Sequence, residues 1–264
     1  MNYFTIDDDF NYIIEFFNPS KDIEINKCNH GKSSFVYYVK IDNKDYIYKF
    51  PRTCFQTKFF KKEEYITNLL NNYFSVRIPH IKILKYENKE LIYYDLIDGN
   101  NMSDIALNDK EYEVLCYELA NFLKELYTIN VETFDFPLET KKDNIENFCK
   151  DFNYKPNFSI IEDIINDNSN VIHGDFHRSN IIVDNNKHLN GILDFSTLSI
   201  GSVYFDLGHM CFSMNEQFNK LFLNICEKVL GIKIDMDKIN RTIHFLDEMI
   251  NKNYLPYIRS KNHV

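Results

Sequence analysis

Apolar residues follow a two-residue period in the first third of the chain. Runs rich in Val, Ile, Tyr and Phe alternate there with turn-forming Asn, Asp and Gly, which predicts short strands joined by tight turns. An amphipathic helix is expected before them over residues 7–17, because acidic residues open that segment and its apolar positions recur at helical spacing. The expected strands span residues 23–25, 35–41, 46–51, 78–84 and 90–94. Together they predict a five-stranded antiparallel sheet.

Helical spacing dominates the rest of the chain. One helix interrupts the strands at residues 61–70, with an inner face at positions 59, 66, 70 and 73. A longer helix begins after Asn108 or Asp109 as N-cap, and its apolar stripe lies at positions 115, 119, 122, 123 and 126. Further helices are expected over residues 143–152, 160–165, 215–230 and 236–250. The pattern therefore predicts a strand-rich unit followed by a larger helical one.

One hairpin stands out between the helices. The apolar runs 180–183 and 191–193 flank the turn-formers 184–186, and Asn tolerates the positive φ that a tight reversal needs. Folding this hairpin places Asn180 opposite Asp194. An amide oxygen and a carboxylate that face one space are plausible ligands for Mg²⁺. Ordinary turn chemistry explains an Asn-rich hairpin equally well, so the neighbouring residues decide between the two.

The spacing before the hairpin favours chemistry. His173, Asp175 and Asn180 form the pattern H-x-D-x-x-x-x-N, and a D-F pair follows at Asp194. This is the spacing of a kinase catalytic loop and its metal-binding segment. It predicts Asp175 as the catalytic residue, with Asn180 and Asp194 as metal ligands.

The run H-G-D-F-H-R-S-N, followed by I-L-D-F-S and then by Asp206-Leu207, resembles the aminoglycoside phosphotransferase and choline kinase-like superfamily. The resemblance implies a bilobal, protein-kinase-like α+β fold with ATP in the cleft between the lobes. Residues 1–94 are expected to form a five-stranded nucleotide-binding lobe, 95–99 a hinge, and 100–264 a mainly helical lobe with the catalytic loop and acceptor site.

The same resemblance implies a set of nucleotide-binding residues. Lys49 would reach the α- and β-phosphates of ATP, paired with Glu63 in preference to Glu64. The alternative for these residues is a solvated, charged surface. Backbone N–H groups of the turn at 29–34, with Ser33 or Ser34, would cover the phosphates, and the Asp95 carbonyl and Ile97 N–H would hold adenine.

Roles around the catalytic loop follow from the resemblance as well. Asp175 would orient the acceptor hydroxyl and take its proton, while His173 braces the loop. Asp206 resembles an aspartate that supports the site through hydrogen bonds, and a helix N-cap is its alternative role. Ser196 departs from the pattern, because many members have Gly there, and a serine restricts the backbone.

Composition narrows the partners and the compartment. A net charge of −9 argues against nucleic acid, because phosphate backbones require a basic face. The first residues are acidic, unlike a signal peptide, and no apolar run reaches membrane-spanning length. Six scattered cysteines without a C-x-x-C pair fit reduced thiols. We expect a cytoplasmic protein, monomeric or weakly dimeric, that binds no membrane.

The acceptor is the least determined feature. Residues 104–146 contain eleven acidic residues against four lysines, which suits a polycationic aminoglycoside, although solvated helix faces have the same composition. Choline, homoserine, methylthioribose or a sugar stay open as acceptors. A protein of another class, a nucleotide-binding pseudokinase, is disfavoured by the intact Asp175, Asn180 and Asp194 set.

Overall fold

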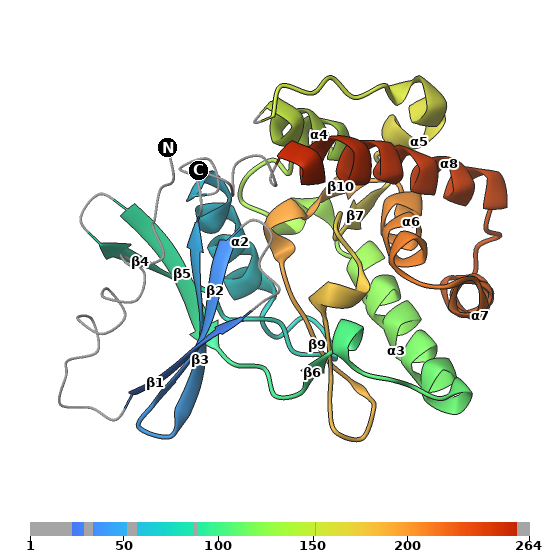
Figure 1. Ribbon diagram of the computed structural model, residues 1–264. Coiled ribbons are helices and arrows are strands. Elements are labelled where there is room, and N and C mark those ends of the chain that lie inside the picture. Colours follow the sequence, from blue (N-terminus) through green and yellow to red (C-terminus); the bar gives the residue numbers. More distant parts are fainter. Residues whose placement is uncertain (1–22, 29–33, 52–56, 87–88, 151, 258–264) are drawn as a thin grey trace. The chain divides into compact units, whose positions relative to one another are not determined.

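The computed structural model describes residues 23–28, 34–51, 57–86, 89–150 and 152–257. The expected helix at 7–17 and residue Ser33 lie outside these ranges. The chain divides into two compact units (Figure 1). The first comprises Met1–Tyr73 with Arg77–Asp98, and the second Phe74–Val76 with Gly99–Val264.

The first unit is built on one antiparallel sheet, with strand order β1-β2-β3-β5-β4 (Figure 1). Its elements are β1 (Ile23–Cys28), β2 (Ser34–Ile41), β3 (Lys44–Pro51), α2 (Thr57–Leu70), β4 (Lys82–Tyr86) and β5 (Lys89–Asp95). The predicted five-stranded sheet is thus confirmed. The strand expected from residue 78 begins only at Lys82, because Pro79 has no N–H to donate to a ladder.

Aromatic residues fill one face of this sheet. Tyr37, Tyr48 and Phe50 are almost completely buried and pack with Val39 and Leu91. Since successive side chains of a strand point to opposite faces, Lys49 lies on the face opposite Tyr48 and Phe50.

Helix α2 packs against β4 and β5 with a face slightly different from the predicted one. Its buried side chains are Phe60, Glu63, Ile66, Thr67 and Leu70. The prediction of positions 59 and 73 was wrong, because Phe60 takes the inner position and the helix ends before Tyr73, which is exposed.

The second unit combines short strands with helices (Figure 1). Its strands are β6 (Asn100–Asn101), β7 (Asn170–Ile172), β8 (Ile181–Val183), β9 (Leu189–Ile192) and β10 (Ser199–Gly201). Its longer helices are α3 (Asp109–Tyr127), α4 (Lys141–Lys150), α6 (Val203–Ser213), α7 (Glu216–Leu230) and α8 (Met236–Leu246). Short helical segments are η1 (Met102–Asp104), η2 (Val131–Thr133), η3 (Phe158–Ile161), α5 (Glu162–Ile165), η4 (Arg178–Asn180), η5 (Phe195–Thr197) and the π-helix η6 (Asp247–Tyr254).

Two helix pairs form the core of this unit, α3 with α7 and α6 with α8. The predicted stripe of α3 is buried, and Asn108 caps the helix in a reciprocal capping box with Glu111. At the α6–α8 crossing, Gly208 allows close approach, because a Cβ there would lie 2.5 Å from Thr242 Cγ2. Helix α6 was not predicted, and it carries residues that matter below.

Two further sequence expectations concern the whole chain. In the described ranges, the five cysteines are free thiols: Cys28, Cys116, Cys149, Cys211 and Cys226. None of the described helices combines the length and apolarity needed to cross a bilayer.

Candidate active site

The predicted catalytic loop, residues 173–180, joins two small sheets of the second unit. It leaves β7, which pairs with β10, and enters the β8–β9 hairpin through η4. The predicted hairpin is confirmed, but its turn differs, because the positive φ falls on Lys187 rather than on an asparagine. Asp184 accounts for this, since its carboxylate accepts the N–H groups of Asn186 and His188 and organises the turn.

The hairpin register also corrects one prediction. Ile181 pairs with Ile192, and the Leu193 N–H donates to the Asn180 carbonyl at 2.8 Å, so Asn180 lies opposite Leu193 and not Asp194. Asp194 has already left the strand in a left-handed conformation, with φ 65° and ψ 67°. That conformation is costly for a non-glycine residue and is typical of functional sites.

Asp206 holds the backbone of the catalytic loop. Its carboxylate is fully buried and accepts the N–H of His173 at 3.0 Å and of Gly174 at 2.7 Å. Burial raises its pKa, and the two N–H donors and His173 oppose that rise. The N-cap of α6 is Ser202, so the supporting role expected for Asp206 is confirmed and the N-cap alternative is wrong.

His173 links the loop to the metal-binding segment. Its Nδ1 accepts the Asp175 N–H at 3.3 Å, so its Nε2 carries the proton and donates to the Leu193 carbonyl at 3.0 Å. Burial lowers the pKa of His173 and favours the neutral ring. The expectation that His173 braces the loop is therefore confirmed.

Gly174 and Lys141 complete the support of the loop. Gly174 has φ +82°, and a Cβ on it would lie 2.5 Å from the Thr197 carbonyl oxygen, so only glycine fits. Lys141 of α4 is buried, with 5% of its surface exposed, and its Nζ donates to the Gly174 carbonyl at 2.5 Å. The ammonium also lies 5.5 Å from the centre of the Phe205 ring.

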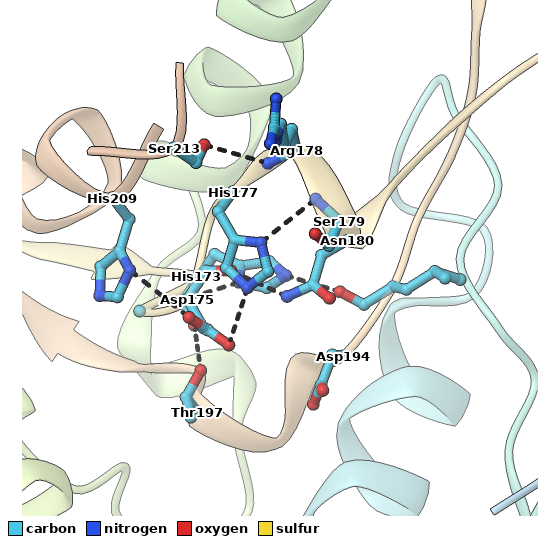
Figure 2. Close-up of polar contacts among 12 residues, drawn as sticks. His173, Asp175, His177, Arg178, Ser179, Asn180, Asp194, Thr197, His209 and Ser213 are labelled. Atoms are coloured by element: carbon cyan, nitrogen blue, oxygen red, sulfur yellow. Dashed lines mark hydrogen bonds and ion pairs between the residues drawn. The ribbon is translucent and has the colours of Figure 1, made fainter. Parts of the chain in front are cut away.

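Two imidazoles flank the carboxylate of Asp175 (Figure 2). His177 Nε2 lies 3.5 Å from one oxygen, and His209 Nδ1 lies 3.4 Å from the other. A third of the side chain is exposed, and in the described residues it makes no ion pair with Lys or Arg. Burial alone would raise the pKa of Asp175, but His177, then His209 and Lys141, outweigh it and hold that pKa well below its usual range. Asp175 is therefore ionised at neutral pH.

Asn180 is oriented so that its side-chain oxygen is available to an ion. The side-chain amide nitrogen donates a hydrogen bond to the Asp175 carbonyl at 2.9 Å. Since this bond fixes the orientation of the amide group, Oδ1 points away from the Asp175 carbonyl. The side chain is nearly buried, with 9% of the residue surface exposed. This orientation fits an oxygen ligand for a hard cation.

Asp194 is held by its own turn. The Ser196 hydroxyl donates to Asp194 Oδ1 at 2.7 Å, and Ser196 lies in η5 without a positive φ. The expected backbone restriction at Ser196 has no cost here, because the left-handed residue is Asp194. In the described ranges, no group of three or more His, Cys, Asp or Glu side chains could hold a metal.

The predicted nucleotide-binding residues of the first unit are placed as follows. Lys49 is half-buried, and its Nζ lies 5.8 Å from the centre of the Tyr94 ring. Glu63 is 2% exposed, whereas Glu64 accepts the Ile83 N–H at 2.9 Å. These environments favour Glu63 over Glu64 as the inward-facing carboxylate. The pairing of Lys49 with Glu63 stays a prediction.

The remaining predicted residues lie at strand ends. Ser34 opens β2 and is buried. Asp95 closes β5 and is exposed, and Ile97, two residues on, is buried. Their contacts with a nucleotide stay predictions.

Sequence reasoning missed three side chains of the loop environment: His177, His209 and Lys141. His177 was detectable, since it lies two residues after Asp175 within the motif. His209 and Lys141 lie more than thirty positions from Asp175 and carry no local signal.

Comparisons with known proteins agree with this geometry. A model of the phosphotransferase enzyme family matches residues 155–235, the segment with the catalytic loop and the hairpin. The fold is similar to that of APH(2″)-IIIa in complex with GDP and kanamycin, with a TM-score of 0.71, 19% identity, and coverage of 97% of this chain and 93% of that one.

Two further solved structures share the fold. Macrolide 2′-phosphotransferase type I matches with a TM-score of 0.66, 15% identity and coverage of 98% and 97%. ADP-bound aminoglycoside phosphotransferase APH(2″)-Ib matches with a TM-score of 0.56, 20% identity and coverage of 90% and 98%.

The shared fold and the family match over the loop and hairpin agree with the prediction of a small-molecule kinase. The match over residues 155–235 and the likeness of fold along the chain confirm the resemblance to the aminoglycoside phosphotransferase and choline kinase-like superfamily.

Proposed function

We propose that this protein transfers the γ-phosphoryl group of ATP to a hydroxyl group of a small molecule, with Asp175 as the catalytic base. The observation that carries the proposal is the state of Asp175: ionised, partly exposed, and without a Lys or Arg ion pair in the described residues. A carboxylate in that state can accept a hydrogen bond from an acceptor hydroxyl and take its proton.

Asn180 and Asp194 are the proposed ligands for Mg²⁺. The fit rests on the oriented Asn180 amide and on the Asp194 carboxylate fixed by Ser196. Mg²⁺ needs few protein ligands when phosphate oxygens and waters supply the rest, which agrees with two side chains. When bound, the ion would supply the positive charge that phosphoryl transfer needs at the phosphate oxygens.

Residues 1–94 are the proposed nucleotide-binding lobe, 95–99 the hinge, and 100–264 the catalytic and acceptor lobe. Lys49, supported by Glu63, would contact the phosphates, and Ser33 and Ser34 would cover them. Asp95 and Ile97 would hold adenine through backbone groups. ATP is the proposed donor, and GTP is the comparison to make, because the similar solved structures hold GDP in one case and ADP in another.

The acceptor we favour is an amino sugar of the aminoglycoside type, whose phosphorylation would cause antibiotic resistance. Two observations support it. One protein of the same fold was solved with kanamycin. The segment 104–146, with eleven acidic residues against four lysines, has the charge that attracts a polycation.

A less cationic metabolite is the second candidate, because several of these acids are occupied elsewhere. Glu111 completes the α3 cap, and Glu118 accepts the Leu189 N–H at 2.7 Å. Asp143 accepts the Thr140 hydroxyl at 2.7 Å. The groups in contact with the Asp175 carboxylate are imidazoles, which do not attract a polycation. Homoserine, methylthioribose or a sugar fits this environment, and choline tests a singly charged acceptor.

A panel assay separates these possibilities. Purified protein with Mg²⁺ and either ATP or GTP is offered aminoglycosides, choline, homoserine, methylthioribose and sugars, and nucleoside diphosphate release and acceptor mass are measured. An aminoglycoside acceptor predicts affinity that falls as salt rises. Binding of Mg²⁺–nucleotide without transfer to any acceptor would instead favour the pseudokinase.

A further inference from the structure

His209 lies on the same face of α6 as Asp206. The two residues are three positions apart, the spacing that places side chains side by side on a helix. Asp206 binds the backbone of the catalytic loop, and His209 approaches the side chain of Asp175, with Nδ1 3.4 Å from its carboxylate (Figure 2). One helix face thus contacts both the backbone and the catalytic side chain of the loop.

We propose that His209 is a positioning residue, which fixes the Asp175 carboxylate by donating its Nδ1–H to one carboxylate oxygen. The inference rests on the proposed function, in which Asp175 is the base.

The proton position follows from the surroundings of the ring. His209 is 4% exposed, and among the described residues its Nε2 has no hydrogen-bond partner. A proton on Nε2 would be buried without an acceptor, and the Nδ1 lone pair would then face a carboxylate. A proton on Nδ1 avoids both costs. The buried ring is neutral, because burial lowers the pKa of His209 to about 3, against the opposing effect of Asp175.

His177 also presents a ring N–H group to the Asp175 carboxylate, but from its other ring nitrogen. Its Nδ1 accepts the Ser179 N–H at 3.2 Å, as the N-cap of η4, so the ring proton lies on Nε2. That nitrogen faces the second oxygen of Asp175, at 3.5 Å. The Asp175 carboxylate therefore lies between the Nε2–H group of His177 and the Nδ1–H group of His209.

This arrangement suits a base better than an ion pair would. The charged or titratable groups around His209 are Asp175, Lys141, His177 and His173. Lys141 donates its ammonium N–H to the Gly174 carbonyl. Two imidazole N–H groups, one on each carboxylate oxygen, restrict rotation of the carboxylate and leave its lone pairs available to the acceptor proton.

Packing alone does not explain a histidine at this position. The neighbouring positions Leu207, Met210 and Cys211 of α6 are buried and apolar. A buried imidazole with an unsatisfied nitrogen is less favourable than an apolar side chain unless its other nitrogen has a partner. Asp175 is that partner.

The direct test measures the tautomer and needs no substrate. Long-range ¹H–¹⁵N correlation spectra of the full chain report which nitrogen of each histidine is protonated, and His209→Asn assigns the signal. We expect a neutral His209 ring with the proton on Nδ1 at neutral pH, and a changed signal in Asp175→Ala. A proton on Nε2, or an Nδ1–H signal unchanged by Asp175→Ala, would overturn the proposal.

Kinetics supply the second test. An Asn side chain places a donor near the position of Nδ1, whereas Leu fills similar space without a donor. We therefore expect His209→Leu to lower kcat roughly 10-fold and His209→Asn to keep most of the wild-type kcat. The KM for nucleotide should be unchanged in both variants. His244→Leu makes the same change at an exposed position of α8 and should have no effect. Equal losses in Asn and Leu variants of equal Tm, or wild-type kcat in the Leu variant, would overturn the proposal.

The two tests separate the possible failures. Absence of turnover with every acceptor would reject the proposed function, while the tautomer would still report on the contact between His209 and Asp175. Normal turnover with a proton on Nε2 would reject only the positioning role.

Discussion

The catalytic loop and the metal-binding segment are held in different ways. The loop around Asp175 depends on distant side chains: Lys141 from α4 and Asp206 and His209 from α6. Asp194 has a local bond, from the Ser196 hydroxyl two residues later. The proposed base is thus fixed by tertiary structure, while the proposed metal ligand is fixed partly by its own turn. Substitutions in the two regions should therefore have different effects on stability and activity.

The largest expected effect belongs to the metal-binding segment. Asp194→Asn removes a proposed ligand charge from a half-buried turn and keeps the shape of the side chain, so Mg²⁺-dependent turnover should be abolished while the fold is kept. Turnover measured across Mg²⁺ concentrations, with Tm as control, checks this. Near-normal activity in the variant would contradict the assignment of Asp194.

Lys141→Met should affect the loop through stability. The change removes a buried charged donor to the Gly174 carbonyl, and a hydrogen bond of this kind contributes about 1.5–3 kcal/mol to the free energy of unfolding. Denaturant unfolding monitored by circular dichroism measures the loss.

Lys150→Met is the matched control for Lys141→Met, since Lys150 lies at the exposed end of the same helix. Its stability should change little. Equal losses in the two variants would show that the Lys141 contact contributes nothing specific.

Ser196→Ala tests the local support of Asp194. Loss of the hydroxyl donor should raise the Mg²⁺ concentration needed for half-maximal turnover and lower kcat by about 3- to 10-fold, because loss of one partly exposed hydrogen bond costs roughly 0.5–1.5 kcal/mol. Ser199→Ala is the control, since the buried Ser199 hydroxyl has no partner among the described residues. An unchanged Mg²⁺ requirement in Ser196→Ala would count against this support.

The smallest expected effect lies outside both regions. Asp163 pairs with Arg241 at 2.6 Å, and this contact, with Lys238, lowers the pKa of Asp163 to about 2. Because the folded pKa lies below the unfolded one, the stabilisation is present above about pH 4 and is lost as pH falls through about 2. Asp163→Asn should lower Tm only slightly at neutral pH, since the pair is partly exposed, and should leave turnover unchanged. A large loss of turnover would show that this pair is coupled to the site.

The difference between local and distant contacts also explains which features the sequence could predict. Asp175, Asn180 and Asp194 lie within twenty residues, and the spacing of a loop and hairpin brings them together. The sheet of the first unit and the stripe of α3 follow from simple periodicity. Lys141 and His209 reach the loop only through the packing of α4 and α6, and no short-range pattern records that contact. Helix α6 itself was missed because its apolar positions lie all around the helix and give no amphipathic period.

The hairpin register shows a second limit of prediction from residue spacing. Counting residues placed Asn180 opposite Asp194, but the strands pair one residue out of that register, with Ile181 opposite Ile192, and Asp194 lies beyond the strand in a left-handed conformation. Residue spacing alone does not reveal the register or which of several Asx residues adopts the left-handed conformation, since both depend on the turn that the folded hairpin makes.

Single-turnover phosphoryl transfer by the wild type and by Asp175→Asn is the most direct test of the central claim. With Mg²⁺, ATP and the acceptor found in the panel, the wild type should phosphorylate the acceptor, and the variant should do so ~10²- to 10⁴-fold more slowly while binding ATP with unchanged affinity. Transfer by Asp175→Asn at a rate close to that of the wild type would contradict the assignment of Asp175 as the base.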